Sequence, residues 1–309
     1  MLQFVIKRLL TGLAVLWIIV TVTFFLLRLL PGGPFTMEKS LPPIVIKNIE
    51  AKYRLNDPLI IQYRDYVLSV LKGDLGPSFK YEDRTVNDII EEGAPVSFEL
   101  GVKSVCISVV LGIPLGIIAA LRHGKWQDRL ISFGTVIGIS VPGFIMAGFM
   151  VVVFSIHLKL LPAAMWEGWR YKILPLMALS LGPIAGITRL TRTSMLDVLS
   201  QDYVKLAYAK GLSKVTVLAK HALPNALIPV VTIMGPLLAG IITGSFVIES
   251  IFVVPGIGKA FVQSINNRDY TLLLGLTIFY SVLLIVLNIV VDLIYPFLDP
   301  RIKIVKGKG

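Results

Sequence analysis

The sequence is poor in residues that could hold a metal or form a disulfide. Cys106 is the only cysteine, which excludes an intrachain disulfide, and it lies within an apolar run. His123, His157 and His221 fall in three different segments, and neither His-Glu-x-x-His nor Gly-x-Ser-x-Gly occurs. We therefore expect no metal site and no hydrolase site, and we interpret Cys106 as a small, buried apolar residue.

A nucleotide-binding loop is also missing. Lys125, Lys259 and Lys308 each follow a glycine, but none has the upstream glycine and the following hydroxyl residue of Gly-x-x-x-x-Gly-Lys-Ser/Thr. The chain is therefore not expected to bind ATP by that route. We predict no catalytic residues and no cofactor bound by this chain.

Charged residues are scarce as well. They make up 16% of the 309 residues, whereas hydrophobic residues make up 55% and the mean hydropathy is +0.79. A soluble domain has an apolar share of about 45 to 50%, so this chain is expected to be solvated by lipid. The net charge of +11 would suggest nucleic acid binding in a soluble protein. In a membrane protein, basic residues instead indicate orientation, and no nucleic acid partner is expected.

Six apolar runs approach the length of about 20 residues that a helix needs to cross a bilayer core about 30 Å thick. They occupy residues 9–30, 98–121, 131–156, 173–190, 227–248 and 272–296. The first run is longer than the centre of a signal peptide and lacks a small-residue cleavage site, so it is expected to be a retained span. An even number of spans places both termini on one side.

Basic residues identify that side. Lysines and arginines concentrate in four short segments, at residues 7–8, 122–129, 189–220 and 301–308, whereas the loop at 31–97 has no basic excess. Short basic segments face the cytoplasm in most membrane proteins. We therefore predict that both termini are cytoplasmic and that the long loop is external.

The external loop carries signals for short surface helices. Asp57 and Pro58 are typical of a helix start, and Gly73 of a helix end. Residues 85–88 have the spacing of a capping box. Glu99 and Lys103 lie four residues apart where the second span begins, and they are predicted to pair.

Glycines four residues apart recur in the spans, a spacing that lets membrane helices approach closely. The pairs are Gly112 and Gly116, Gly134 and Gly138, Gly182 and Gly186, and Gly240 and Gly244. We therefore predict a compact bundle. No long internal repeat is found, which argues against an inverted-repeat secondary transporter.

Polar residues form a stripe on the last span, within a sector about 60° wide. They are Thr277, Ser281, Asn288 and Asp292. A carboxylate within a span costs about 2.5 to 3.5 kcal/mol on insertion scales, so it should face the bundle interior or water. The stripe is either the wall of a translocation pathway or a polar seam between helices, and Asp292 could instead pair with Arg301 or Arg189.

A shorter stripe on the fifth span has the same two interpretations. It consists of Thr232, Ala239 and Thr243, with Glu249 at its external end.

A basic loop between the fourth and fifth spans carries the most informative pattern. Its candidate residues are Asp202, Lys205, Ala207, Lys210, Gly211, His221, Leu223 and Pro224. Gly211 is expected to end a short helix and reverse the chain, and Pro224 to keep the next helix from running on unbent. The alternative is a solvated basic segment held by anionic lipid head groups, at about 1 kcal/mol for each Lys or Arg.

This loop resembles the cytoplasmic loop of ATP-binding-cassette importer permeases, whose pattern is Glu-Ala-Ala, three residues, Gly, nine residues, Ile, any residue, Leu-Pro. The matching positions are Ala207, Gly211, Leu223 and Pro224. The general pattern is only partly kept, because its first two positions are Lys205 and Leu206 and its Ile position is His221. The surrounding residues resemble the dipeptide, oligopeptide and nickel branch of that superfamily.

Other segments extend the resemblance over the whole chain. Similar to this branch are residues 7–10, 28–35, 73–78, 254–258 and 267–270. Residues 41–58 and 240–249 look most like the first permease subunit, the B-type subunit, of bacterial oligopeptide importers.

The resemblance implies an all-α integral membrane protein with six transmembrane helices, the type I importer permease fold and short surface helices in the first external loop. Residues 1–95 would form the first span and the external loop. Residues 96–298 would form the permease core, with a coupling loop at 191–226, and residues 299–309 a basic cytoplasmic tail.

The resemblance also implies a heteromeric peptide importer in the bacterial cytoplasmic (inner) membrane. This chain would form half of the pathway for oligopeptides beside a second homologous permease, surrounded by membrane lipids. Two ATPase subunits would bind ATP and Mg inside the cell, and a peptide-binding protein would deliver substrate from outside. The chain itself would not be an enzyme.

The sequence is also compatible with other substrates and other functions. Dipeptide, nickel and glutathione importers belong to the same family. An ion-driven peptide symporter would use Asp292 and Glu249 as proton carriers, and an intramembrane enzyme would need a nucleophile and a base on facing spans. A lipid-anchored scaffold would tolerate a bulky residue at Gly211.

Overall fold

The computed structural model describes residues 2–29, 54–81, 83–244 and 246–298. Within these ranges the chain is helical apart from turns and one isolated bridge between Pro77 and Thr85. The chain divides into two compact units. The first is Met1–Val96 with Pro255–Ile285, and the second is Ser97–Val254 with Val286–Gly309.

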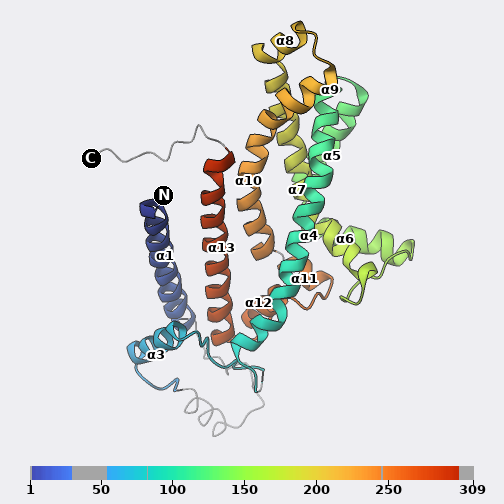
Figure 1. The fold of residues 1–309 in the computed structure, drawn as a ribbon. Coiled ribbons are helices and arrows are strands. Elements are labelled where there is room, and N and C mark those ends of the chain that lie inside the picture. Colours follow the sequence, from blue (N-terminus) through green and yellow to red (C-terminus); the bar gives the residue numbers. More distant parts are fainter. Residues whose placement is uncertain (1, 30–53, 82, 245, 299–309) are drawn as a thin grey trace. The chain divides into compact units, whose positions relative to one another are not determined.

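The first unit is held together by two apolar clusters. Its helices are α1 (Leu2–Leu29), α3 (Leu59–Leu71), α12 (Ile257–Asn266) and the first parts of α4 (Val86–Leu121) and α13 (Tyr270–Leu298) (Figure 1). Val86, Ile257 and Leu276 pack together in one cluster. Phe24 and Leu274 belong to the other. Helix α13 therefore contacts α4 and α12 through one set of residues and α1 through another.

The surface helix expected after Pro58 is confirmed as α3. The amides of Ile61 and Gln62 both donate to the Pro58 carbonyl, as in a first helical turn. The side chain of Asp57 does not cap this helix, contrary to expectation. Instead, the backbone carbonyl of Asp57 accepts a hydrogen bond from the side-chain amide (Nε2) of Gln62 at 2.8 Å. Gly73 has a φ of 81°, in the left-handed region that favours glycine, and the segment ends there as predicted.

The predicted capping box is present, but the helix that it starts is longer than expected. The Thr85 amide donates to Asp88 Oδ2 at 2.9 Å, and the Asp88 amide donates to Thr85 Oγ1 at 3.2 Å. Helix α4 then continues through Pro95 to Leu121 instead of ending in the external loop. A separate second surface helix was therefore a wrong prediction, because Pro95 removes one amide without ending the helix.

A buried carboxylate joins two loop segments of the first unit. Asp269, which is 1% exposed, accepts bonds at Oδ1 from the amides of Phe79 at 3.2 Å and Leu272 at 3.1 Å. Its Oδ2 accepts a bond from the hydroxyl of Ser78. Asp269 thus caps the start of α13 and holds the loop before α4 against it.

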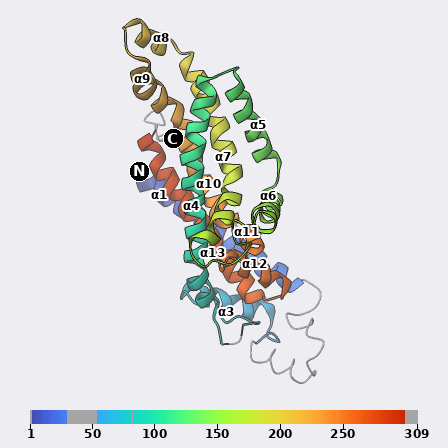
Figure 2. The same ribbon diagram turned by 90° about the vertical axis from the view of Figure 1, so that its right-hand side faces the viewer.

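The second unit contains long helices that run alongside one another and shorter helices that run in other directions. It contains the rest of α4 and α13 and the helices α5 (Trp126–Ser140), α6 (Gly143–Met150), η1 (Val151–His157), α7 (Trp169–Leu199), α8 (Asp202–Ala209), α9 (Lys214–Thr216), η2 (Val217–Ala222), α10 (Leu223–Gly244) and α11 (Phe246–Ile251). Helix α7 packs against both α5 and α10, and α8 and α9 project at one end of these helices (Figures 1 and 2).

Five helices in the described ranges are long and apolar enough to cross a membrane, and the count becomes six if a bent pair is taken as one span. The bent pair corresponds to the predicted span at 131–156, where α5 and the segment α6–η1 meet at 105°. Pro142 explains the break, because a residue before proline is pushed out of the helical region. Val141 accordingly has φ −89° and ψ 121°. The predicted run exists, but it is not a straight helix.

Three of the predicted glycines permit close helix contacts in the second unit. A Cβ atom at Gly112 would lie 2.8 Å from a side-chain atom of Ile187, and one at Gly116 would lie 2.5 Å from Thr191. A Cβ atom at Gly138 would lie 2.8 Å from Ala185. Helix α7 therefore approaches α4 and α5 closely at glycines.

The other predicted glycines do not make such close contacts, apart from Gly244, whose surroundings lie outside the described residues. Gly134, Gly186 and Gly240 have no such neighbour within 4 Å, and Gly182 makes only an ordinary contact at 3.8 Å.

The side chain of Cys106 is exposed, so its interpretation as a buried residue was wrong. In a membrane span, outward-facing residues are as apolar as inward-facing ones, so composition does not separate them.

Candidate functional site

The predicted basic loop folds as a helix, a turn and a second helix. Val204 and Ala207 face inward from α8, at 0% and 5% exposure, and pack on the fully buried Val217. Val198 and Leu199, at the end of α7, complete this cluster. The small side chain of Ala207, one of the pattern residues, therefore lies where α8 contacts the rest of the second unit.

The turn after α8 depends on Gly211. Its φ is 80°, and its amide donates to the Tyr208 carbonyl at 2.9 Å, while the next amide, of Leu212, donates to the Ala207 carbonyl at 3.3 Å. This is how a left-handed glycine closes a helix. Ser213 then caps α9, since its hydroxyl oxygen accepts a bond from the Thr216 amide at 3.3 Å.

The outward face of the turn is apolar with a charged edge. Tyr203, Leu206 and Val215 are 43%, 56% and 75% exposed. Lys205 Nζ and Asp202 Oδ1 lie 2.9 Å apart on the surface of α8, and this hydrogen bond holds the pKa of the Asp202 carboxyl below its usual value. The sequence prediction included the two charged residues but missed the three apolar ones. Their helical spacing relative to Val204 and Ala207 would have indicated Tyr203 and Leu206, whereas Val215 lies on α9, beyond the turn.

The chain remains helical where Pro224 was expected to bend it. The widened π-helical segment η2 ends at Ala222, and α10 begins at the next residue, Leu223, just before Pro224. The Asn225 side chain donates to the His221 carbonyl at 2.9 Å, so a carbonyl near the missing proline amide is satisfied. His221 and Leu223 are half-buried and Pro224 is exposed.

The polar stripe on α13 is half-buried. Thr277 Oγ1 donates to the Leu273 carbonyl and Ser281 Oγ to the Thr277 carbonyl, each at 2.7 Å, and Asn288 is also partly exposed. Both hydroxyls are thus satisfied within their own helix. The side chain of Asp292 lies outside the described residues, as does Arg301, so a pathway wall and a polar seam both stay predictions.

The stripe on the fifth span ends at a buried acid. Glu249, on α11, is fully buried, and the Ser97 hydroxyl donates to its Oε1 at 2.8 Å. Thr232 is half-buried on α10, and the side chain of Thr243 lies outside the described ones. The carboxylate of Glu249 is therefore enclosed within the second unit, and its role in a pathway stays a prediction.

Two ion-pair groups connect the helices of the second unit. The predicted contact of Glu99 with Lys103 is present, and Lys172 from α7 joins it at 2.6 Å, a partner that the sequence did not suggest. Near the other end of α7, Arg192 binds both carboxylate oxygens of Asp128, at 2.6 and 2.9 Å. Asp128 is 4% exposed, so this fork-like pair holds α5 to α7.

Two protein-family models match the chain. The model described as "Binding-protein-dependent transport system inner membrane component" matches residues 112–304. The model for the N-terminal part of such membrane components matches residues 1–100. The first match includes the basic loop and the bent third span.

Curated proteins of similar sequence cover nearly the same length. The chain is 50% identical to the dipeptide transport system permease protein DppB of Bacillus subtilis, over 99% of each chain. It is 48% identical to the oligopeptide transport system permease protein OppB of Haemophilus influenzae, over 98% of this chain and 100% of that one. The OppB protein of Salmonella typhimurium is 46% identical with the same coverage.

Solved structures of similar fold include chains of two transporters. A chain of the MetNI methionine ABC transporter, in an inward-facing conformation, aligns with a TM-score of 0.58 and 16% identity. A chain of an amino acid ABC transporter aligns with a TM-score of 0.55 and 12% identity. Both alignments cover 68% of this chain, and 96% and 94% of the other chains. At this identity the likeness establishes the fold.

Proposed function

This chain belongs to the family of binding-protein-dependent transport system inner membrane components, and from that premise we propose that it forms half of the translocation pathway of an ATP-driven peptide importer. It is a multi-pass permease subunit of the bacterial inner membrane and not an enzyme. Energy therefore has to come from other subunits, and a surface that receives it is required.

The exposed apolar surface of α8 and α9 is suited to receive this energy. An apolar patch at the tip of a basic loop is costly in water, and such patches are typical of interaction sites. Val204 and Ala207 pack the inner face of α8 against the rest of the second unit. Tyr203 and Leu206, on its outer face, are exposed and can bind in a groove of a partner. We assign this groove to the ATPase subunits, whose closure on ATP and Mg would move α8.

The arrangement of charge supports one orientation in the membrane. We propose that α8, α9 and both termini are cytoplasmic, because the basic excess lies in those segments. The loop that contains α3 would then be external. An extracytoplasmic peptide-binding protein would deliver its cargo on that side, and a second homologous permease would supply the other half of the pathway.

Peptides are the proposed cargo. Relatives of similar identity are named for dipeptide and for oligopeptide transport, so we propose oligopeptides with dipeptides as the alternative. Selection of the side chains would belong to the external binding protein. The wall would be formed by the two polar stripes: Thr232, Thr243, Glu249, Thr277, Ser281, Asn288 and Asp292.

The coupling proposal is tested by placing a charge on the outward face of α8. Leu206→Glu, reconstituted with the partner subunits, should lower peptide uptake about tenfold, because burying a carboxylate in an apolar groove costs at least about 1.4 kcal/mol. Uptake of labelled peptide and ATP hydrolysis are measured in the same vesicles. Ile60→Glu, on the exposed face of α3 in the external loop, is the matched control and should transport normally.

Two results would refute this assignment. Uptake by Leu206→Glu at the wild-type rate would show that α8 does not receive the motion. Uptake by the purified chain without ATPase subunits, driven by a proton gradient, would favour a symporter in which the acids of the stripes carry protons.

A further inference from the structure

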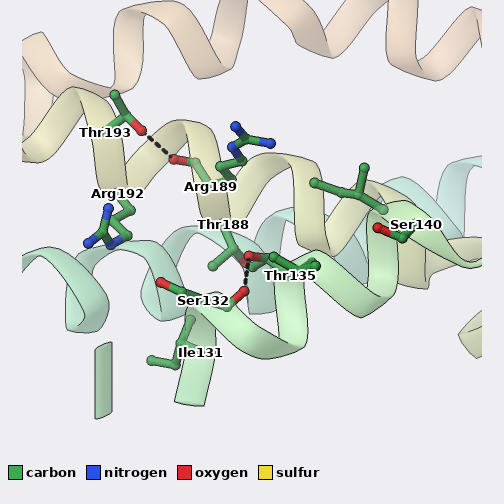
Figure 3. A pocket seen from close by; sticks show the side chains of 10 residues that line it. Ile131, Ser132, Thr135, Ser140, Thr188, Arg189, Arg192 and Thr193 are labelled. Atoms are coloured by element: carbon green, nitrogen blue, oxygen red, sulfur yellow. Dashed lines mark hydrogen bonds between the residues drawn. The ribbon is translucent and has the colours of Figure 1, made fainter. Parts of the chain in front are cut away.

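A pocket of about 430 Å³ opens between α5 and α7 in the second unit (Figure 3). Helix α5 contributes Ser132 and Thr135, which lie close to Thr188 of α7 in Figure 3. Arg189, also on α7, lines the pocket as well, and its guanidinium lies on the opposite side of α7 in this view. The pocket is near the end of α7 that leads into α8. Arg189 falls at the edge of the apolar run at 173–190, at the depth where lipid head groups begin in the orientation proposed above.

The pocket carries one uncompensated positive charge. Arg192 also lines it, but its guanidinium is bound by both oxygens of Asp128. The side chain of Arg189 is exposed and makes neither a hydrogen bond nor an ion pair with any residue in the described ranges. A ligand with a single negative charge would therefore match the site.

A buried hydroxyl beside Arg189 is also without a partner. Thr188 is 1% exposed, and its Oγ1 has no hydrogen bond within the described part of the chain. Leaving such a group unsatisfied costs about 1 to 3 kcal/mol. The hydroxyl is enclosed and Thr188 points toward α5 in Figure 3, so a ligand would contact the exposed guanidinium of Arg189 and not this hydroxyl.

The remaining wall of the pocket is apolar and continues onto the outer face of α5. Val136 and Ile139 line the pocket and are 59% and 49% exposed. Leu130 and Phe133, on the same helix, are 61% and 65% exposed. A ligand with an anionic group and a long apolar part would contact both regions, whereas a peptide carboxylate would leave the apolar wall uncovered.

We propose that this pocket binds the head-group phosphate of an anionic phospholipid from the cytoplasmic leaflet. Arg189 donates to the phosphate oxygens, and the acyl chains lie along Val136 and Ile139. Basic pockets between membrane helices on the cytoplasmic side are suited to such head groups. The inference rests on the membrane orientation of the proposed function, but not on transport.

Native mass spectrometry of the purified full chain in detergent tests this site. Phosphatidylglycerol is titrated against the wild type, Arg189→Gln and Thr188→Val, with Arg129→Gln as the matched control. Arg129 is an exposed arginine on α5 that does not line the pocket. Arg189→Gln should weaken binding about tenfold, whereas Thr188→Val, which changes only the enclosed hydroxyl, and Arg129→Gln should bind as the wild type does.

Several outcomes would overturn the proposal. Equal affinity of Arg189→Gln and the wild type would remove the site, as would equal affinity of the wild type for phosphatidylcholine and phosphatidylglycerol. A tripeptide that competes with the lipid, when its amidated form does not, would assign the pocket to a substrate carboxylate. Because lipid binding is measured without ATPases, its loss leaves the peptide-uptake test of Leu206→Glu intact, and failure of that test leaves the lipid titration valid.

Discussion

The α8–α9 turn and the Asp269 contact are built in opposite ways. The turn is anchored by three small apolar side chains, Val204, Ala207 and Val217, and its outward residues are exposed. Asp269 is buried, and its oxygens accept three hydrogen bonds from Ser78, Phe79 and Leu272. Each region contains residues of segments that pointed to the family. One region exposes its side chains, and the other encloses them.

This difference separates two kinds of mutational effect. Substitution of an exposed residue on α8 leaves the packing unchanged, so a loss of uptake there would report on partner contact. Substitution of Asp269 leaves buried donors without acceptors, so its main effect should be on folding.

Asp269→Ala should lower the free energy of unfolding by roughly 2 to 4 kcal/mol, because the Ser78 hydroxyl and two amides lose their acceptor. Thermal unfolding of the purified chain in detergent measures the loss. Asp269→Asn keeps an oxygen for the two amides and should cost less than about 1.5 kcal/mol. Equal losses in the two variants would mean that the charge, and not the acceptor geometry, holds this contact.

Gly211→Val should destabilise the turn by about 1 to 3 kcal/mol, because a β-branched residue is strained at a φ of 80°. A Cβ atom would meet nothing within 4 Å, so the cost comes from the backbone alone. Gly211→Asn, which tolerates this φ, is the control. Amide hydrogen exchange in α8 should accelerate about tenfold or more in the valine variant only, and unchanged exchange would contradict the strained turn.

Lys205→Gln should have the smallest effect, since the pair with Asp202 is exposed at 67% and 97%. At neutral pH the thermal midpoint should match that of the wild type within error. Lys205 depresses the pKa of Asp202, so any stabilisation is present above the usual aspartate pKa and disappears as the pH falls through the lowered value. A midpoint that drops clearly at neutral pH would show that the pair supports α8.

Patterns within one segment were predictable from the sequence. The capping box at Thr85 and Asp88 and the helix end at Gly211 require only residues that are close in the chain, and both are present. The apolar runs indicated the spans because a bilayer demands their length. Pro142 is visible in the sequence too, but the apolar run alone does not show that it is divided there into helices that meet at 105°.

Contacts between distant segments were not predictable in the same way. No spacing rule connects Asp269 with Ser78 or Arg192 with Asp128, because those pairs form only after helices from different parts of the chain have packed. Gly112 and Gly134 show the same limit. Both belong to a predicted glycine pair, yet only Gly112 lies against a neighbouring helix.

The exposed thiol on α4 makes this permease convenient for spectroscopy. Since Cys106 is unique in the sequence and lies within an apolar span, a water-soluble maleimide label would leave it unmodified, and it would not need to be removed first. Cysteines introduced on α8 and on α5 would then carry a pair of labels that follow, during nucleotide turnover, how far α8 travels.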